Sequence, residues 1–246
     1  MNTATAENNV MYISQAENFS KIPGSPIAYW VSTSFIKCFN TARILDDTFC
    51  MREGIHTADN ERFLKIWFEV DYKSIVFDAS SYEYIDQHGK WVPYNKGGTF
   101  RKWYGNNEYV IAFNKAARLA MEKLKGHVRP SQSLYFREGG TWTAVSSGKF
   151  GIRYYPKGYL FDAGGQVAVG SDIIGCIAYL NTILFSKIAE ITMPTINFKC
   201  GVIKTLPDLR VSNCNIEKKS AENIGLSKVD WDSFETSWDF KKHPLI

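Results

Sequence analysis

The sequence predicts an α+β fold, with a mixed, mainly antiparallel β-sheet core and two main helices. The 246-residue chain is 45% apolar and 22% charged, and its seven Trp, thirteen Tyr and sixteen Phe can fill a substantial core. Residues 133–169 alternate short aromatic or β-branched runs with glycine-containing turns, which is typical of antiparallel sheet. Residues 114–126 and 171–191 have the composition of helices.

The N-terminal part is predicted to hold a short helix followed by strands. The first eighteen residues are polar and are expected to be loosely ordered. Pro and Gly in residues 21–32 lead into an apolar segment that is expected to continue as a short helix to about Phe39. Residues 63–77 are rich in β-branched and aromatic side chains and predict strands, and the His-Gly-Lys turn within 81–95 predicts a hairpin.

The two main helices have recognisable ends. Ala, Leu, Met and Lys dominate from Asn114, and Gly126 is expected to close the first helix. Ser171 is the expected N-cap of the second helix, and Pro194 follows its end. Residues 198–209 predict a short strand.

The C-terminal tail, residues 211–246, is predicted to carry a short amphipathic helix. Ser227 and Asp230 match the capping-box pattern. They precede three aromatic residues at helical spacing, namely Trp231, Phe234 and Trp238.

Composition narrows the class of protein. No run of eighteen apolar residues is present, so no membrane partner is expected, and the first residues lack the basic head and apolar stretch of a signal peptide. The five cysteines are scattered and never spaced C-x-x-C. This usage argues against a disulfide framework or a structural zinc site and predicts a cytoplasmic location.

Positive charge is concentrated in the middle of the chain. The segment from Lys90 to Arg129 contains nine Lys and Arg residues, and its acidic residues are Glu108 and Glu122 alone. Residues 94–107, YNKGGTFRKWYGNN, place three of these cations between aromatic residues and glycines. The cluster is either one solvated face of a helix or hairpin, or a surface that binds a polyanion.

The usual catalytic motifs are absent from the sequence. It holds no Walker-type phosphate loop, no H-E-x-x-H zinc motif and no G-x-S-x-G nucleophile elbow, and its four histidines lie in unrelated contexts. DAGGQVAVG at 162–170 lacks dinucleotide-loop spacing and is interpreted as a turn. One pattern at 207–219 matches metal-dependent nucleases, with Asp208 and Glu217 as Mg²⁺ ligands and Lys219 as a charge stabiliser, provided that both carboxylates lie on adjacent strands.

Several stretches together resemble one family. They are FSKIPGSPIAYWVS, REGIHTADNERF, WVPYNKGGTFRKWYGNNEYVI, GGTWT, IAYLNTILF, MPTINFKCGVIKTLPDL and SKVDWDSFETSWDF, in this order along nearly the whole chain. They resemble the target recognition region that follows the catalytic domain in PglX-like adenine-specific DNA methyltransferases of bacteriophage-exclusion (BREX) systems. They are similar, more distantly, to recognition domains of type IIG restriction–modification enzymes.

The resemblance implies a module that recognises double-stranded DNA but does not methylate by itself. The family's S-adenosylmethionine loop and N-P-P-Y motif are not in this sequence, so that cofactor is expected only in the full-length enzyme. Residues 1–40 are expected to link to the absent catalytic domain, 41–210 to form the recognition domain, and 211–246 to form the tail. The expected partners are the catalytic domain of the parent protein and other phage-defence proteins.

The resemblance also suggests which residues face DNA. Contacts to phosphates or base edges are expected from Lys96, Arg101 and Lys102. Similar contacts are expected from Arg62 and Arg153. Adenine readout is assigned to the amides of Asn60, Asn106 and Asn107, and Thr57 belongs to the same proposed surface.

Each assignment has a structural alternative. Asn106 and Asn107 could simply form a turn, and Trp103 and Tyr104 could anchor a hairpin in the core. Thr57 and Asn60, with Gly54, could only cap the element that begins near Asp59. In the family motif G-x-x-T-G-x-N-x-x-F, Ala58 replaces a glycine, which matters if that position has a positive φ.

A second class of function is a protein-docking fragment. The aromatic tail favours this alternative, because the apolar face of an isolated amphipathic helix needs a partner surface.

Overall fold

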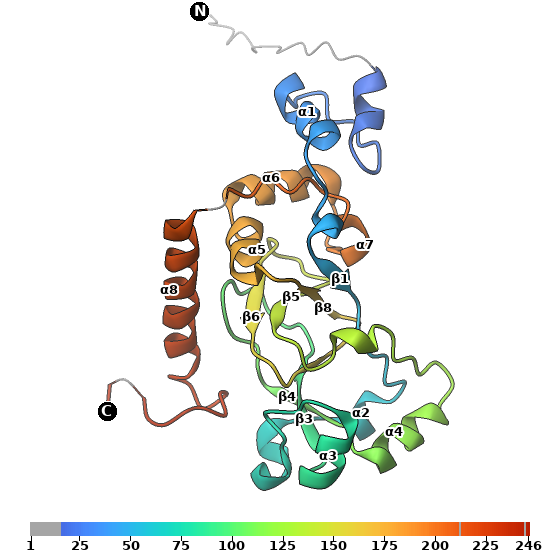
Figure 1. Cartoon of the computed structure of the whole chain (residues 1–246), viewed down its shortest axis with the longest axis vertical. Coiled ribbons are helices and arrows are strands. Elements are labelled where there is room, and N and C mark those ends of the chain that lie inside the picture. Colours follow the sequence, from blue (N-terminus) through green and yellow to red (C-terminus); the bar gives the residue numbers. More distant parts are fainter. Residues whose placement is uncertain (1–15, 212, 244) are drawn as a thin grey trace, which may run out of the picture.

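The chain folds around two four-stranded sheets with helices at both ends (Figure 1). This computed structural model describes residues 16–211, 213–243 and 245–246. The first eighteen residues, which were expected to be loosely ordered, lie largely outside the described residues. The remaining part of that stretch begins a 3-10 helix, Ala16–Lys21.

The first sheet is entirely antiparallel, with strand order β1-β8-β5-β6. Its strands are β1 (Cys50–Arg52), β5 (Gly139–Thr143), β6 (Arg153–Tyr155) and β8 (Gly165–Val169). The antiparallel sheet predicted within residues 133–169 is therefore present.

The second sheet has strand order β2-β4-β3-β7, and only its β3–β7 pair is parallel. Its strands are β2 (Leu64–Ile66), β3 (Trp91–Asn95), β4 (Tyr109–Ala112) and β7 (Leu160–Phe161). The predicted α+β class with a mixed, mainly antiparallel core is confirmed, although the strands form two sheets.

Eight α-helices occur among the described residues. They are α1 (Thr33–Thr41), α2 (Asn60–Phe63), α3 (Tyr82–His88), α4 (Lys115–Glu122), α5 (Ile173–Leu180), α6 (Ile183–Thr192), α7 (Cys200–Ile203) and α8 (Cys214–Trp231). Figure 1 shows α1 at one end, α2, α3 and α4 at the other, and α8 alongside the first sheet. The part of the chain described contains no single helix long and apolar enough to cross a membrane, and α5 and α6, which together would suffice, are bent by 69°.

Strand β8 divides the two main cores. Successive side chains of a strand point to opposite faces. Val167 and Val169 belong to the core beside the second sheet, whereas Ala168 between them belongs to the core formed with α5 and α6. The first sheet therefore packs against other parts of the chain on both of its faces.

In the N-terminal half, one prediction is met only in part and another is wrong. Residues 63–77 form only the short strand β2 and then 3-10 turns, because the carboxylate of Glu69 accepts the Ile66 N–H at 2.7 Å and Asp71 accepts the Lys73 N–H. Such local side-chain bonds compete with a strand ladder. Residues 81–95 form α3 and β3 instead of a hairpin, since the Ser81 hydroxyl caps the helix by accepting the Tyr84 N–H.

The helix predicted at 171–191 is two helices, and its N-cap is Asp172 rather than Ser171. The buried amide of Asn181 interrupts it, because this side chain accepts the Ile152 N–H and donates to the Ile152 carbonyl. The Thr182 hydroxyl then caps α6.

The strand predicted at 198–209 is also absent. Its first half forms α7, whose first N–H, that of Cys200, donates to Gln166. The tail helix is longer and earlier than predicted: α8 begins after Asn213 and ends at Trp231, so Ser227 and Asp230 lie within its last turns.

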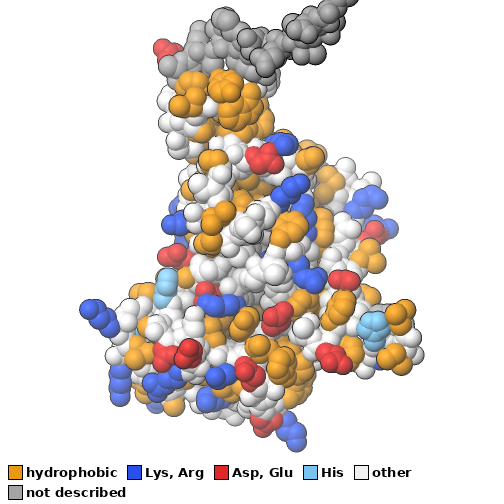
Figure 2. All heavy atoms as spheres, turned by 180° about the vertical axis from the view of Figure 1, so that it is seen from behind, with side chains coloured by type: hydrophobic (Ala, Val, Ile, Leu, Met, Phe, Trp, Pro, Cys, Tyr) orange, Lys and Arg blue, Asp and Glu red, His pale blue; other side chains and the backbone are white. Residues whose placement is uncertain are grey.

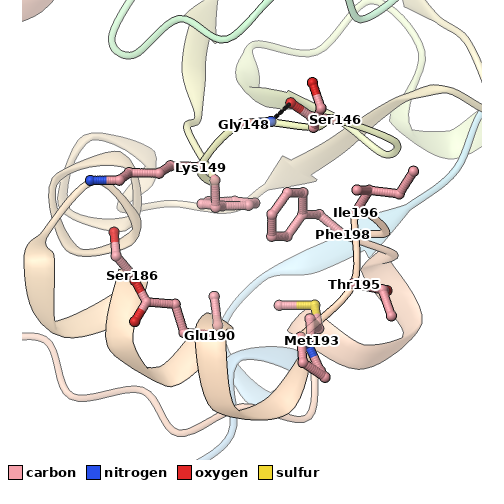
Figure 3. A pocket seen from close by; sticks show the side chains of 13 residues that line it. Ser146, Gly148, Lys149, Ser186, Glu190, Met193, Thr195, Ile196 and Phe198 are labelled. Carbon is pink, nitrogen blue, oxygen red and sulfur yellow. Dashed lines mark hydrogen bonds between the residues drawn. The ribbon is translucent and has the colours of Figure 1, made fainter.

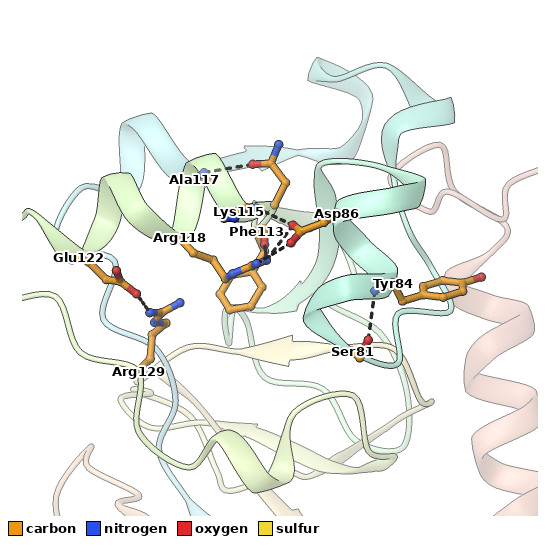
Figure 4. Close-up of polar contacts among 10 residues, drawn as sticks. Ser81, Tyr84, Asp86, Phe113, Lys115, Ala117, Arg118, Glu122 and Arg129 are labelled. Atoms are coloured by element: carbon orange, nitrogen blue, oxygen red, sulfur yellow. Dashed lines mark hydrogen bonds and ion pairs between the residues drawn. The ribbon is translucent and has the colours of Figure 1, made fainter.

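Helices α3 and α4 are joined by a charged contact (Figure 4). Arg118 is 9% exposed, and its Nη1 and Nη2 donate to the two carboxylate oxygens of Asp86 at 3.1 and 2.8 Å. The Lys115 N–H donates to the same carboxylate at 2.6 Å. These hydrogen bonds, led by Arg118, lower the pKa of Asp86.

Stability should therefore decrease in acid partly through Asp86. A carboxyl group with a lowered pKa in the folded state stabilises the fold above its unfolded pKa of about 4, and this contribution is lost as pH falls through the folded pKa. We expect Asp86→Asn to be less stable than the parent at pH 7, and we expect this difference to be smaller at pH 2.5. Urea unfolding at both pH values measures this, and an unchanged difference would contradict the assignment.

Candidate nucleic-acid interface

Three predicted DNA-facing residues meet in one open, polar pocket of about 390 Å³. Thr57 and Asn60 come from the segment around α2, and Lys96 follows β3. The polar lining also includes His56, Asp162 just after β7, and Lys125 beyond α4. The pocket thus joins segments that are distant in sequence, and Lys125 and Asp162 are two members that the motif analysis missed.

Close packing between backbone atoms fixes the position of the Thr57–Asn60 segment. The Ile55 N–H donates to the Phe161 carbonyl at 2.8 Å, and a Cβ atom at Gly54 would lie only 1.9 Å from that carbonyl oxygen. Ala58 has φ +63°, so the residue that replaces the family glycine does occupy the left-handed region. The Asp59 carboxylate then caps α2 by accepting the Arg62 N–H.

The buried hydroxyl of Thr57 orients the exposed amide of Asn60. It donates to Asn60 Oδ1 at 2.6 Å, and no hydrogen bond with the described residues occupies Asn60 Nδ2. The amide nitrogen and the second lone pair of Oδ1 remain available. This is the donor–acceptor pair that matches N7 and the amino group of adenine.

Lys96 is held by the carboxylate of Asp162. Its Nζ lies 2.8 Å from Asp162 Oδ2, which also accepts the Tyr94 hydroxyl at 3.0 Å, while Oδ1 accepts the Gly164 N–H at 2.7 Å. Burial, followed by the nearby carboxylate, raises the pKa of Tyr94, so its phenol stays protonated and donates. Much of the Lys96 charge is therefore compensated within the protein.

Arg101 and Lys102 lie elsewhere and contact other parts of the chain. Arg101 forms an ion pair with Asp230 at 3.4 Å and stacks 4.9 Å from the centre of the Trp231 ring. Lys102 Nζ donates to the Asn181 carbonyl at 2.7 Å, and burial followed by the charge of Lys149 lowers the pKa of Lys102. Both cations fasten the loop at 96–107 to the α5–α6 break and to α8.

The same loop buries most of its other polar residues. Asn106 has φ +60° and donates from Nδ2 to the Thr99 carbonyl at 2.8 Å, which fits a turn-forming role. Asn107 is 3% exposed and Arg153 is 2% exposed. Tyr104 belongs to the core formed with α5 and α6, and Trp103 packs against that core, as the core-anchor alternative predicts. Arg62, by contrast, is exposed and lies over the Phe63 ring.

The nuclease pattern does not meet its structural requirement. Asp208 lies outside the strands and is bonded to the guanidinium of Arg210, and Glu217 lies in the first turn of α8. Within the described ranges, no group of three or more His, Cys, Asp or Glu side chains could hold a metal ion.

A second pocket, of about 350 Å³, was not predicted from sequence (Figure 3). It lies between the 146–150 turn and α6. Met193 and Phe198 supply apolar walls, and Lys149 and Glu190 lie at opposite sides of the opening (Figure 3).

Fold and pocket together describe an α+β module that presents an oriented amide between two lysines. No family model matches the sequence. The chain is 37% identical over 248 aligned residues, 97% of its length, to the adenine-specific methyltransferase PglX of Lacticaseibacillus casei (strain Zhang). It is 38% identical over 235 residues, 93% of its length, to the adenine-specific methyltransferase BrxX of Escherichia coli O9:H4 (strain HS).

These matches confirm the resemblance to PglX-like methyltransferases along nearly the whole chain. The chain spans only about a fifth of the length of these relatives, 20% of PglX and 18% of BrxX. It therefore corresponds to a small part of much longer methyltransferases.

Proposed function

We propose that this module recognises double-stranded DNA for an adenine-specific methyltransferase of phage defence in the cytoplasm. The similarity to two adenine-specific methyltransferases supports the class, and the pocket that unites Asn60, Thr57 and Lys96 supports DNA recognition. In this proposal, residues 1–40 lead to the catalytic domain, 41–210 recognise DNA and 211–246 form a supporting tail.

Methyl transfer is assigned to the rest of the parent enzyme. The relatives' names imply S-adenosylmethionine as methyl donor, but the glycine turn of this chain does not fit a cofactor. A Cβ atom at Gly165 would lie 2.1 Å from the Asn95 carbonyl oxygen, so neighbouring backbone fills the space beside the turn. The module's role is then to position DNA, not to hold the methyl donor.

Within the pocket, Asn60 is the proposed adenine reader and Thr57 its positioning residue. Lys125 and Arg62 are exposed and free to approach phosphates, whereas Lys96 brings a partly compensated charge. Arg101, Lys102, Asn106, Asn107 and Arg153 form a separate, largely buried group under and within the 96–107 loop.

Replacing Arg62 and Lys125 together by glutamine should weaken duplex binding and make it less sensitive to salt. Each lost phosphate contact lowers the magnitude of the slope of log K against log salt by about 1. The slope of the double variant should therefore be smaller in magnitude by about 2. Fluorescence anisotropy with a fixed duplex at several salt concentrations measures this. The matched control is the double variant Lys218→Gln/Lys219→Gln, which removes the same charge at two exposed sites near the start of α8, on the other side of the molecule (Figure 1). Equal slopes for the double variant and the control would refute the interface.

Docking within a defence complex is the second candidate. Figure 2 shows hydrophobic side chains gathered over the N-terminal segment, where Ile27 is 72% and Trp30 56% exposed. The tail gives less support than predicted, because Trp231 is buried and Trp238 packs against the core beside the second sheet. The salt titration separates the two candidates, since a docking surface alone gives no salt-dependent duplex binding.

A further inference from the structure

Arg153 is a buried cation that forms no ion pair with any described carboxylate. It lies on β6, the edge strand of the first sheet, with 2% of its surface exposed. Its hydrogen bonding within the described structure is one long contact, 3.5 Å from Nη2 to the Gly97 carbonyl oxygen, and its Nε has no partner. A guanidinium carries five N–H donors, and leaving them unsatisfied in a protein interior is costly.

The charged groups around Arg153 make its position less favourable. Burial, followed by the charge of Arg101, lowers the pKa of Arg153 to about 10, so the group remains cationic at neutral pH. Lys102 and Lys149 also affect each other as like charges. Only Arg101 of these four forms an ion pair with a described carboxylate. Arg153 itself pairs with no described carboxylate and meets the like charge of Arg101.

The 96–107 loop covers this group. Trp103 pairs with the β6 edge: its N–H donates to the Ile152 carbonyl at 2.9 Å and its carbonyl accepts the Tyr154 N–H at 2.7 Å. The loop has no helix or strand of its own, and Trp103 and Asn106 have positive φ values of +73° and +60°. Positive φ values in non-glycine residues store backbone strain, which opening of the loop would relieve.

We infer that the 96–107 loop is a movable cover, and that a phosphate group of DNA enters beneath it to pair with Arg153. The inference rests on the proposed DNA-binding function and adds a phosphate site to it. Opening breaks the two Trp103 backbone bonds at the β6 edge, the Arg101–Asp230 ion pair and the bond from Lys102 to the Asn181 carbonyl. In return, the buried guanidinium gains the anion that it lacks. A phosphate offers Arg two parallel hydrogen bonds, which a backbone carbonyl cannot match.

A reversible crosslink can hold the cover closed. A Cβ atom built at Gly148 lies 3.5 Å from the Cβ of Phe100, within the range that a disulfide spans. The double variant Phe100→Cys/Gly148→Cys, in a Cys214→Ser background because Cys214 is exposed, therefore locks the loop when oxidised and releases it when reduced. The reduced form of the same protein is the matched control.

We expect the oxidised form to bind a duplex at least tenfold more weakly than the reduced form. Equal binding in the two forms would overturn the cover. Hydrogen exchange at the Trp103 and Tyr154 amides supplies a second measurement, with duplex or inorganic phosphate as the added anion. If either anion speeds hydrogen exchange at these two amides in the reduced form but not in the oxidised form, the result supports a movable cover. Unchanged exchange with both anions overturns it. If phosphate accelerates exchange but no duplex binds, the cover stands and the DNA-recognition function fails.

Arg153→Met separates a binding role from a structural one. Methionine replaces most of the apolar volume without the buried charge, so the melting temperature should be unchanged or higher while the anion-induced exchange at Trp103 disappears. A lower melting temperature with the anion response intact would show that Arg153 serves the fold alone and would overturn the proposal.

Discussion

Replacing Gly54 by alanine is expected to lower the free energy of unfolding by about 3 kcal/mol or more. The added Cβ would lie 1.9 Å from the carbonyl oxygen and 2.5 Å from the carbonyl carbon of Phe161. Both atoms are backbone, so no side-chain rotation relieves the overlap and the Ile55–Phe161 hydrogen bond must lengthen. Overpacking of this kind costs about 1–3 kcal/mol even where side chains can adjust.

The control for this experiment is Gly225→Ala within α8. A Cβ atom at Gly225 meets nothing within 4 Å, and alanine in a helix interior is favoured over glycine by about 1 kcal/mol. Urea unfolding should therefore move in opposite directions for the two substitutions. A Gly54→Ala protein as stable as the parent would show that the strand β7 contact is dispensable.

Gly54 also illustrates what the sequence could and could not predict. The family motif marks Gly54, Thr57 and Asn60 as special, and the motif alone suggests either DNA contact or capping. Their meeting with Lys96 and Asp162 depends on how β3 and β7 pair, and a parallel pair between distant segments leaves no local signal.

Local composition predicted the class of fold better than the positions of elements. The antiparallel strands within 133–169 and the helix starting at Asn114 follow from alternation and capping. The helix at 171–191 breaks because Asn181 bonds to Ile152 on a neighbouring segment, a tertiary contact that overrides helix propensity. The tail helix α8 was predicted too short and too late because few of its side chains are buried, so its apolar periodicity is weak.

Burial of charge was the property least visible in the sequence. Residues 94–107 show a dense set of cations, and dense cations normally indicate a solvated surface. In the fold, Lys96, Arg101 and Lys102 each contact a carboxylate or carbonyl of another segment. Which of these charges are free for DNA therefore depends on acidic partners, Asp162 and Asp230, that are far away in the chain.

Asp162→Ala should destabilise the fold by about 3 kcal/mol while strengthening DNA binding. Asp162 is 7% exposed and accepts hydrogen bonds from Lys96, Tyr94 and the Gly164 N–H. Charged-group hydrogen bonds contribute about 1.5–3 kcal/mol each, and orphaned buried donors cost more. The loss is moderated because Lys96 is partly exposed and can reach water, and because the Tyr94 hydroxyl can donate to the Ile55 carbonyl at 3.1 Å.

The two effects have opposite signs because Asp162 compensates a charge that DNA would otherwise meet. Removing the carboxylate leaves Lys96 uncompensated, so duplex affinity should rise at low salt and the salt slope should steepen by about 1. Glu222→Ala, an exposed site on α8, makes the same change in net charge away from the pocket and should alter stability by less than about 0.5 kcal/mol and leave the slope unchanged. If Asp162→Ala weakened duplex binding at a temperature where the protein remains folded, Lys96 would have no role as a DNA contact. The polar residues of the pocket would then serve only to stabilise the fold.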